Sequence, residues 1–152
     1  MKLYRPLLTF MSALMLASCG GADRYQPQEL PLNHIQALWQ NTRLNERYVI
    51  RSESEWQSVW ALHEPRTIPA TQRPSLDFQA SMILGLTLGS GSNGCEGVSI
   101  RRAVEEEREI RVEYRQNKVD PSMACTASIV SLTDFVSVPQ SDKHVVFVSV
   151  DN

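Results

Sequence analysis

Hydrophobic and polar positions alternate along much of the second half of the chain, and this pattern predicts strands. The uncharged apolar run over residues 82–88 is typical of a central strand, and the alternation over residues 110–115 is that of a half-buried strand. Other β-branched runs predict strands over residues 48–51, 98–104, 128–138 and 145–150. Because most turns between these runs are short, we expect antiparallel pairing.

The first half of the chain carries helical periodicity instead. Apolar residues at helical spacing predict one helix over residues 33–44, with Asn33 as its N-cap. A second helix is predicted where Ser52 and Glu55 form a capping box, ahead of a stripe made of Trp56, Val59, Trp60 and His63. We interpret the two tryptophans as core residues in preference to a cofactor stack. The sequence therefore predicts an α+β fold, a predominantly antiparallel sheet of about five to six strands with one or two N-terminal helices packed on it.

Length and composition narrow the possible functions. A chain of 152 residues fits one domain, and 42% hydrophobic with 21% charged residues is too apolar for a disordered protein. The formal net charge of −2 supplies no basic field, so we expect no nucleic-acid partner.

The N-terminus is typical of an export signal. Basic residues precede the apolar run 6–17, which is too short to span a bilayer as a mature anchor. The run leads into a tetrapeptide that resembles the lipobox of bacterial lipoproteins, Leu16-Ala17-Ser18-Cys19. This resemblance implies cleavage of residues 1–18 and acyl chains on the sulfur and the new amino group of Cys19. The alternative is an ordinary secretory signal followed by a chance cysteine.

The residues after the lipobox suggest a location and a domain organisation. Gly20 follows Cys19, and in lipoproteins of Gram-negative bacteria this resemblance implies sorting to the outer membrane. Glycines and prolines make residues 19–32 a predicted lipidated tether, and residues 33–152 a predicted single domain. No second apolar segment of spanning length follows. We therefore expect a lipid-anchored protein of the cell envelope, on the periplasmic or the surface face of the outer membrane.

We expect two roles for the three cysteines, lipidation for one and a disulfide for the other two. If Cys19 is lipidated, Cys95 and Cys125 remain, and an even pair in an exported protein predicts a disulfide. A metal pair or a catalytic thiol is the alternative, but the chain lacks close ligand spacing such as Cys-x-x-Cys. We predict no metal, no cofactor and no small-molecule ligand.

A glycine-rich loop covers residues 89–97 and holds four of the seven glycines. It lacks the Gly-x-Ser-x-Gly spacing of a nucleophile elbow and the lysine of a phosphate-binding loop. We expect several positive φ angles there, which favour glycine and asparagine. A disulfide-braced loop can present backbone groups to a partner, so we predict a partner-binding loop that includes Ser90, Ser92, Asn93 and Glu96.

Three acidic residues define an enzymatic alternative. A hydrolase could use Asp77, Glu96 or Asp134, provided that the fold joins two of them in a pocket. We instead expect Asp134 to pair with Arg101 or Arg102 across the sheet. The sequence predicts no catalytic residue.

The order of these elements resembles a known family. A strand at residues 49–50, the Trp56…Trp60 helix, Pro-Ser-Leu-Asp-Phe at 74–78, an apolar strand and a glycine-rich turn together resemble the C-terminal domain of PrcB-type lipoproteins, subunits of a protease complex, over residues 47–150. The resemblance implies a protein that accompanies a surface protease and carries no catalytic residues. Gly94-Cys95-Glu96 replaces the Gly-Gly-aromatic turn of that family, which suggests a disulfide-stabilised branch.

These observations predict a non-enzymatic protein-binding or accessory module on a membrane anchor, with a protein partner such as an envelope protease. The alternatives are a structural envelope lipoprotein, which contacts peptidoglycan or an assembly machine, and a hydrolase.

Overall fold

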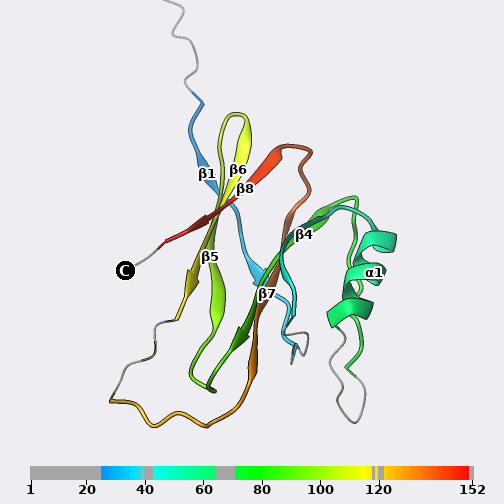
Figure 1. Ribbon diagram of the computed structural model, residues 1–152. Coiled ribbons are helices and arrows are strands. Elements are labelled where there is room, and N and C mark those ends of the chain that lie inside the picture. Colours follow the sequence, from blue (N-terminus) through cyan, green and yellow to red (C-terminus); the bar gives the residue numbers. More distant parts are fainter. Residues whose placement is uncertain are drawn as a thin grey trace, which may run out of the picture.

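Two four-stranded β-sheets pack face to face in the computed structural model, which describes residues 25–37, 39, 43–63, 71–117, 119 and 122–150 (Figure 1). The first sheet has the order β1-β5-β6-β8, and its strands are Gln28–Glu29, Val98–Glu105, Glu109–Gln116 and His144–Ser149. The second sheet has the order β2-β7-β4-β3, and its strands are Asn33–His34, Val130–Pro139, Ser81–Gly91 and Asn45–Ile50. The helix α1, Glu53–His63, lies beside the second sheet. The predicted signal peptide and Cys19 lie outside the described residues.

The α+β prediction is wrong, because the structure is mostly β with two sheets and one short helix in the described residues. The predicted strands all form, within about two residues of their expected ends except where β3 and β4 are three residues longer at one end. Alternation along a strand shows that one face is buried but does not show which strands share a sheet. For this reason the sequence pattern predicts a single sheet where the structure has a sandwich of two sheets.

The helix predicted over residues 33–44 is also wrong. Asn33 and His34 form β2, whose register partners on β7 are Ser137 and Val136. Backbone pairing with a long neighbouring strand has overridden a local capping signal, because tertiary contacts commonly outweigh propensity. The apolar residue Ile35 is still buried, on the side of the second sheet that faces α1.

Strand pairing departs from the prediction at one place. All other pairs are antiparallel, but β6 and β8 run parallel, with Ile110 opposite Val145 and Val112 opposite Phe147. Between these strands the chain passes through β7 in the opposite sheet. A long crossover of this kind is what a parallel neighbour requires.

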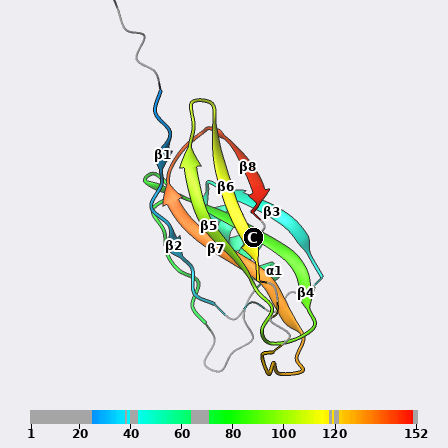
Figure 2. The same cartoon turned by 90° about the vertical axis from the view of Figure 1, so that its left-hand side faces the viewer.

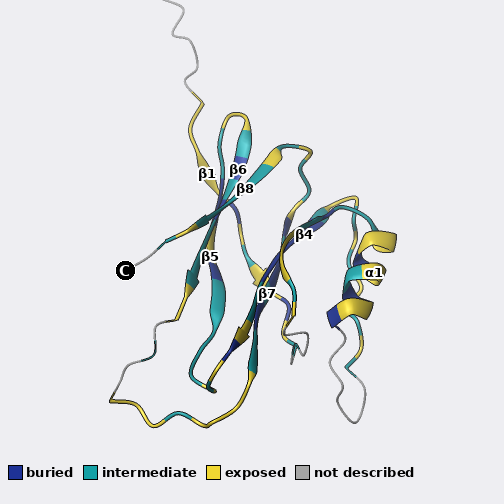
Figure 3. Ribbon diagram, viewed as in Figure 1, coloured by how far each residue is buried: buried dark blue, intermediate teal, exposed yellow. Residues whose placement is uncertain are grey.

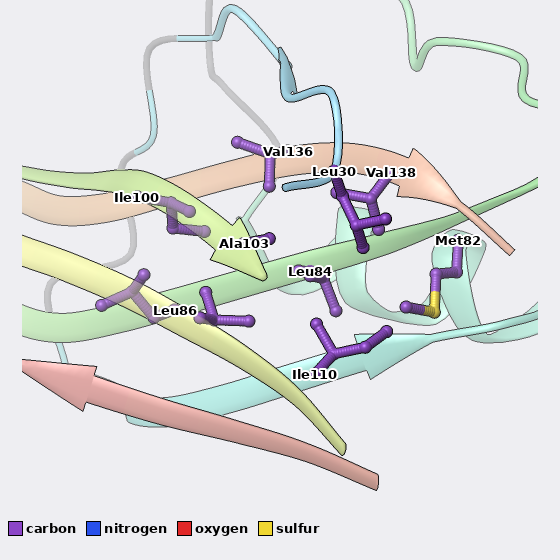
Figure 4. Close-up of a cluster of buried hydrophobic side chains, with 10 residues drawn as sticks. Leu30, Met82, Leu84, Leu86, Ile100, Ala103, Ile110, Val136 and Val138 are labelled. Carbon is purple, nitrogen blue, oxygen red and sulfur yellow. The ribbon is translucent and has the colours of Figure 1, made fainter. Parts of the chain in front are cut away.

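The main core fills the space between the two sheets (Figure 4). Its fully buried members come from both sheets and from the segment after β1, and they are Leu30, Met82, Leu84, Leu86, Ile100, Ala103, Ile110, Val112, Val136 and Val138. On β4 the alternate residue Ile83 points to the other face, where α1 packs. Burial on both faces explains why this strand has a continuous apolar sequence.

The helix α1 covers the outer face of the second sheet with the predicted aromatic stripe. Trp56 is 0% exposed and Trp60 6% exposed, and both pack with Phe135 of β7 in a second core cluster. Figure 3 shows this buried side of the helix and its exposed opposite side. The capping box forms as predicted: Ser52 Oγ accepts from the Glu55 N–H at 3.3 Å, and Glu55 Oε2 accepts from the Ser52 N–H at 3.1 Å. The tryptophans are therefore core residues.

Candidate functional site

Two loops meet at one end of the sandwich, residues 92–97 after β4 and residues 122–129 before β7; together they are called the disulfide-linked loops. Cys95 and Cys125 are bonded, with their Cα atoms 5.5 Å apart and a sequence separation of 30. The predicted disulfide is thus confirmed. In the chain-entropy description, closing a loop of this length stabilises the fold by about 3.6 kcal/mol.

The chain enters the described domain at the opposite end. β1 pairs with the last residues of β5, Val104 and Glu105, whereas the first of the disulfide-linked loops leads into the first residue of β5 (Figures 1 and 2). Tyr25 Oη donates to the Glu105 carbonyl at 3.2 Å and accepts from Lys143 Nζ at 3.3 Å, which fixes the entry point. A strand of eight residues separates the two ends by roughly 25 Å.

Glu96 organises the first of the two loops. Its Oε1 atom accepts from the Ser92 N–H at 3.1 Å, from Ser92 Oγ at 2.7 Å and from Asn93 Nδ2 at 2.9 Å. Hydrogen bonds from Ser92 lower the pKa of the Glu96 carboxyl, so the carboxylate stays charged at neutral pH. Asn93 Oδ1 in turn accepts from the Cys95 N–H at 3.0 Å. Ser92, Asn93 and Glu96 therefore form one network that shapes the loop.

Ser90, the fourth residue of the predicted partner-binding loop, stands apart from this network. It is exposed and lies in β4, opposite Ser131 of β7. The structure thus brings three of the four predicted residues together and leaves the fourth on the sheet.

The glycines in and beside the first loop allow neighbouring segments to pack closely, and few of them have unusual backbone angles. Among the described residues only Gly89 has a positive φ, 87°, so the expectation of several such positions is wrong. At Gly94, whose N–H donates to the Thr126 carbonyl at 2.9 Å, a Cβ would lie 2.2 Å from Thr126 Oγ1. At Gly91 a Cβ would lie 2.8 Å from a methyl group of Val130. Glycine is needed because the two loops touch at Gly94, and because β4 and β7 approach closely at Gly91.

The second loop exposes two large apolar side chains. Ile129 is 76% exposed and Met123 is 61% exposed, on either side of Cys125 in sequence. Sequence reasoning missed both, because Ile129 was assigned to a strand over residues 128–138 and β7 begins only at Val130. The polar residues Thr126 and Ser128 are the sequence signal for a longer loop. Exposed apolar groups on a braced loop are the kind of surface that partner proteins cover.

The three acidic residues of the enzymatic alternative are each engaged locally by different groups. Asp77 Oδ1 accepts from the Gln79 N–H at 2.9 Å in a turn, and Glu96 belongs to the loop network. Asp134 Oδ2 accepts from the Ile100 N–H at 2.7 Å and links the two sheets.

The surroundings of Asp134 differ from the prediction. Its Oδ1 atom lies 3.3 Å from His34 Nδ1, and Arg102 pairs instead with Glu29 at 3.0 Å. The predicted pairing of Asp134 with Arg101 or Arg102 is therefore wrong, because the Asp134 side chain points toward the space between the sheets while Arg102 is exposed on the outer face. Burial raises the pKa of the Asp134 carboxyl, against the lowering effect of the Ile100 N–H.

No cluster of three or more His, Cys, Asp or Glu side chains that could hold a metal occurs in the described part of the chain. No helix among these residues is long and apolar enough to cross a membrane. Family models, curated proteins and solved structures yield no match to this chain. The resemblance to PrcB-type lipoproteins therefore stays a prediction.

Proposed function

We propose that this protein is a bacterial lipoprotein whose β-sandwich is a non-enzymatic protein-binding or accessory module. Cleavage before Cys19 and acylation of that residue would anchor it in the outer membrane, since two or more acyl chains make a stable anchor. We also propose an envelope protease as its partner, on the basis of the sequence resemblance alone.

One observation carries the proposal. The disulfide holds two loops together at the end of the sandwich that lies farthest from the point where the N-terminal segment enters. A module anchored through its N-terminus would present these loops away from the membrane. The internal network of Glu96 and the bridge set the loop shape before binding, which lowers the entropy cost of forming an interface.

The exposed apolar residues supply contact area on this end. Ile129 and Met123 would lose water on binding, at about 25 cal/mol per Å² of apolar surface covered. The polar residues Ser92 and Asn93 lie on the other of the two disulfide-linked loops. Protein interfaces combine apolar and polar residues of this kind.

Crosslinking and pull-down from intact envelopes tests this proposal. Ile129→Glu and Met123→Glu should reduce recovery of the main partner at least tenfold, whereas Leu62→Glu, at another exposed apolar site on α1, should leave it unchanged. In the same cells Cys19→Ser should move the protein out of the membrane fraction or leave it unprocessed. If the loop variants recover every partner as the parent does, the disulfide-linked loops are not the binding surface; recovery of peptidoglycan alone would favour the structural alternative.

A further inference from the structure

The four outer edges of the two sheets are protected to different degrees. β1 and β2 are edge strands of two residues each, and β3 carries the charged residues Glu46 and Arg47 along its length. Short or charged edges are the usual ways in which sheets avoid unwanted pairing. β8 has six residues, His-Val-Val-Phe-Val-Ser, with no lysine, arginine, acidic residue or proline among them. It pairs with β6 on one side only.

The parallel ladder identifies which backbone groups of β8 are free. The Val150 N–H donates to the Tyr114 carbonyl at 2.9 Å, so the amides of Val150 and of alternate residues before it point toward β6. The N–H and C=O groups of Val145, Phe147 and Ser149 therefore point away from β6, to the open edge. They meet no backbone partner among the described residues.

Val145 and Phe147 turn their side chains toward the interior, whereas Ser149, on the same face of the strand, is exposed. Val145 and Phe147 pack against the main core but are only half-buried, because no further strand covers them. Val49 of β3 lies on the same side of the core and is also half-buried. Figure 2 shows β8 and β3 along one side of the molecule.

Arg47 places a positive charge on this side of the molecule, and no salt bridge among the described residues neutralises it. Arg47, which shares its face of β3 with Val49, extends its guanidinium to Tyr114 Oη of β6 at 3.0 Å. Its other acceptors are the neutral oxygens of Asn45, Glu46 and Thr87, and within the described residues it forms no ion pair. Tyr114 lies opposite Ser149 in the ladder, so the charge lies near the C-terminal end of β8.

We propose that the open edge of β8 binds an extended segment of a partner protein by strand addition. Its backbone pairs with Val145, Phe147 and Ser149, its inward apolar side chains cover Val145 and Phe147, and a carboxylate beside Ser149 pairs with Arg47. Main-chain bonds give such a contact its affinity, and the alternate side chains give its specificity. This surface is distinct from the disulfide-linked loops and does not depend on the proposed function.

Amide hydrogen exchange of the full chain, followed residue by residue by NMR, tests this inference. The probe is the capped peptide Glu-Thr-Val-Thr-Val-Thr, which places the carboxylate and two valines on one face when it runs antiparallel to β8. In the free protein the amides of Val145, Phe147 and Ser149 should exchange fast, while those of Val146 and Val148 exchange slowly. At a peptide concentration about ten times the apparent Kd, the three fast amides should slow roughly tenfold.

Matched variants separate the two parts of the contact. Arg47→Met keeps the apolar stem of the side chain and should weaken binding of the glutamate peptide about threefold, whereas Arg73→Met, which removes a half-buried charge paired with Glu53 of α1, should not change it. A peptide with lysine in place of glutamate should bind the parent protein more weakly. Ser149→Pro, which removes only an outward N–H, should abolish the added protection of Phe147.

Three results would overturn the inference. The first is a peptide that leaves the three outward amides unchanged. The second is equal binding of the glutamate and lysine peptides. The third is protection of these amides in the free protein that disappears on dilution, since this would show that the edge pairs with a second copy of the chain.

Discussion

His63 is a buried titratable residue at the end of α1. It is 1% exposed, its ring lies against Tyr48, Phe135 and Trp39, and its Nε2 atom is 3.1 Å from Tyr48 Oη. Its Nδ1 atom is buried and has no hydrogen-bond partner among the residues that the structure describes. A second ring proton would therefore have no acceptor, and burial lowers the pKa of His63 below its ordinary value of 6.5 while Glu46 opposes this.

This environment predicts a pH dependence of stability. Because the pKa of His63 is lowered in the folded state, the unfolded chain binds a proton more readily, and the free energy of unfolding should fall as pH drops below 6.5. The loss should not exceed about 1.4 kcal/mol per pH unit. Urea unfolding between pH 8 and 5 should give a flatter profile for His63→Phe than for the parent. Asp134 is present in both proteins, so its opposite contribution cancels, and equal pH slopes would contradict the assignment.

At the level of elements, the sequence predicted each long strand and the helix α1 but not their arrangement. Alternation and β-branched runs are local signals, and the capping box of Ser52 and Glu55 is complete within four residues. The sheet membership of β8 depends instead on a crossover through β7, which no local pattern records. The two-residue strand β2 was missed for the same reason, since its pairing partner is about 100 residues away.

For the candidate site, the disulfide could be predicted from the sequence, but the extent and exposure of the loops could not. Export and cysteine parity were enough to pair Cys95 with Cys125. Loop length and exposure were not, because Ile129 continues a β-branched run in the sequence although it lies before β7. The glycine positions were evident, but the close contact of Gly94 with Thr126 is a property of two separate loops.

The disulfide joins the loop between β4 and β5 to the loop between β6 and β7, and we expect this bond to stabilise the fold. Replacing both cysteines, Cys95→Ser with Cys125→Ser, should lower the free energy of unfolding by about 3 to 4 kcal/mol, because the unfolded chain regains the entropy of an open loop. Urea denaturation of the parent and the double variant measures the difference, and the parent in reductant serves as a matched control. A change below about 1 kcal/mol would show that the remaining contacts, such as Gly94 with Thr126, already hold the loops together.

At the scale of the whole molecule, the entry of the described chain and the disulfide-linked loops lie at opposite ends of the sandwich; in the proposed function these are the anchoring end and the binding end. The entry at Tyr25 is fixed beside the β5–β6 hairpin by Lys143, whose Nζ donates to the Glu106 carbonyl at 2.7 Å. The disulfide-linked loops are roughly 25 Å away along β5. The open edge of β8 runs between these ends, so a partner could contact both surfaces.

Site-specific photocrosslinking in living cells tests this polarity most directly. A photoreactive phenylalanine analogue is placed at Ile129 or Met123 in the disulfide-linked loops, or at Glu107 in the β5–β6 hairpin beside the entry point. All three positions are exposed, so the substitutions should leave the fold intact. The account predicts that positions 129 and 123 crosslink to the same envelope protein and that position 107 does not. Crosslinks to a protein from position 107 alone would contradict it.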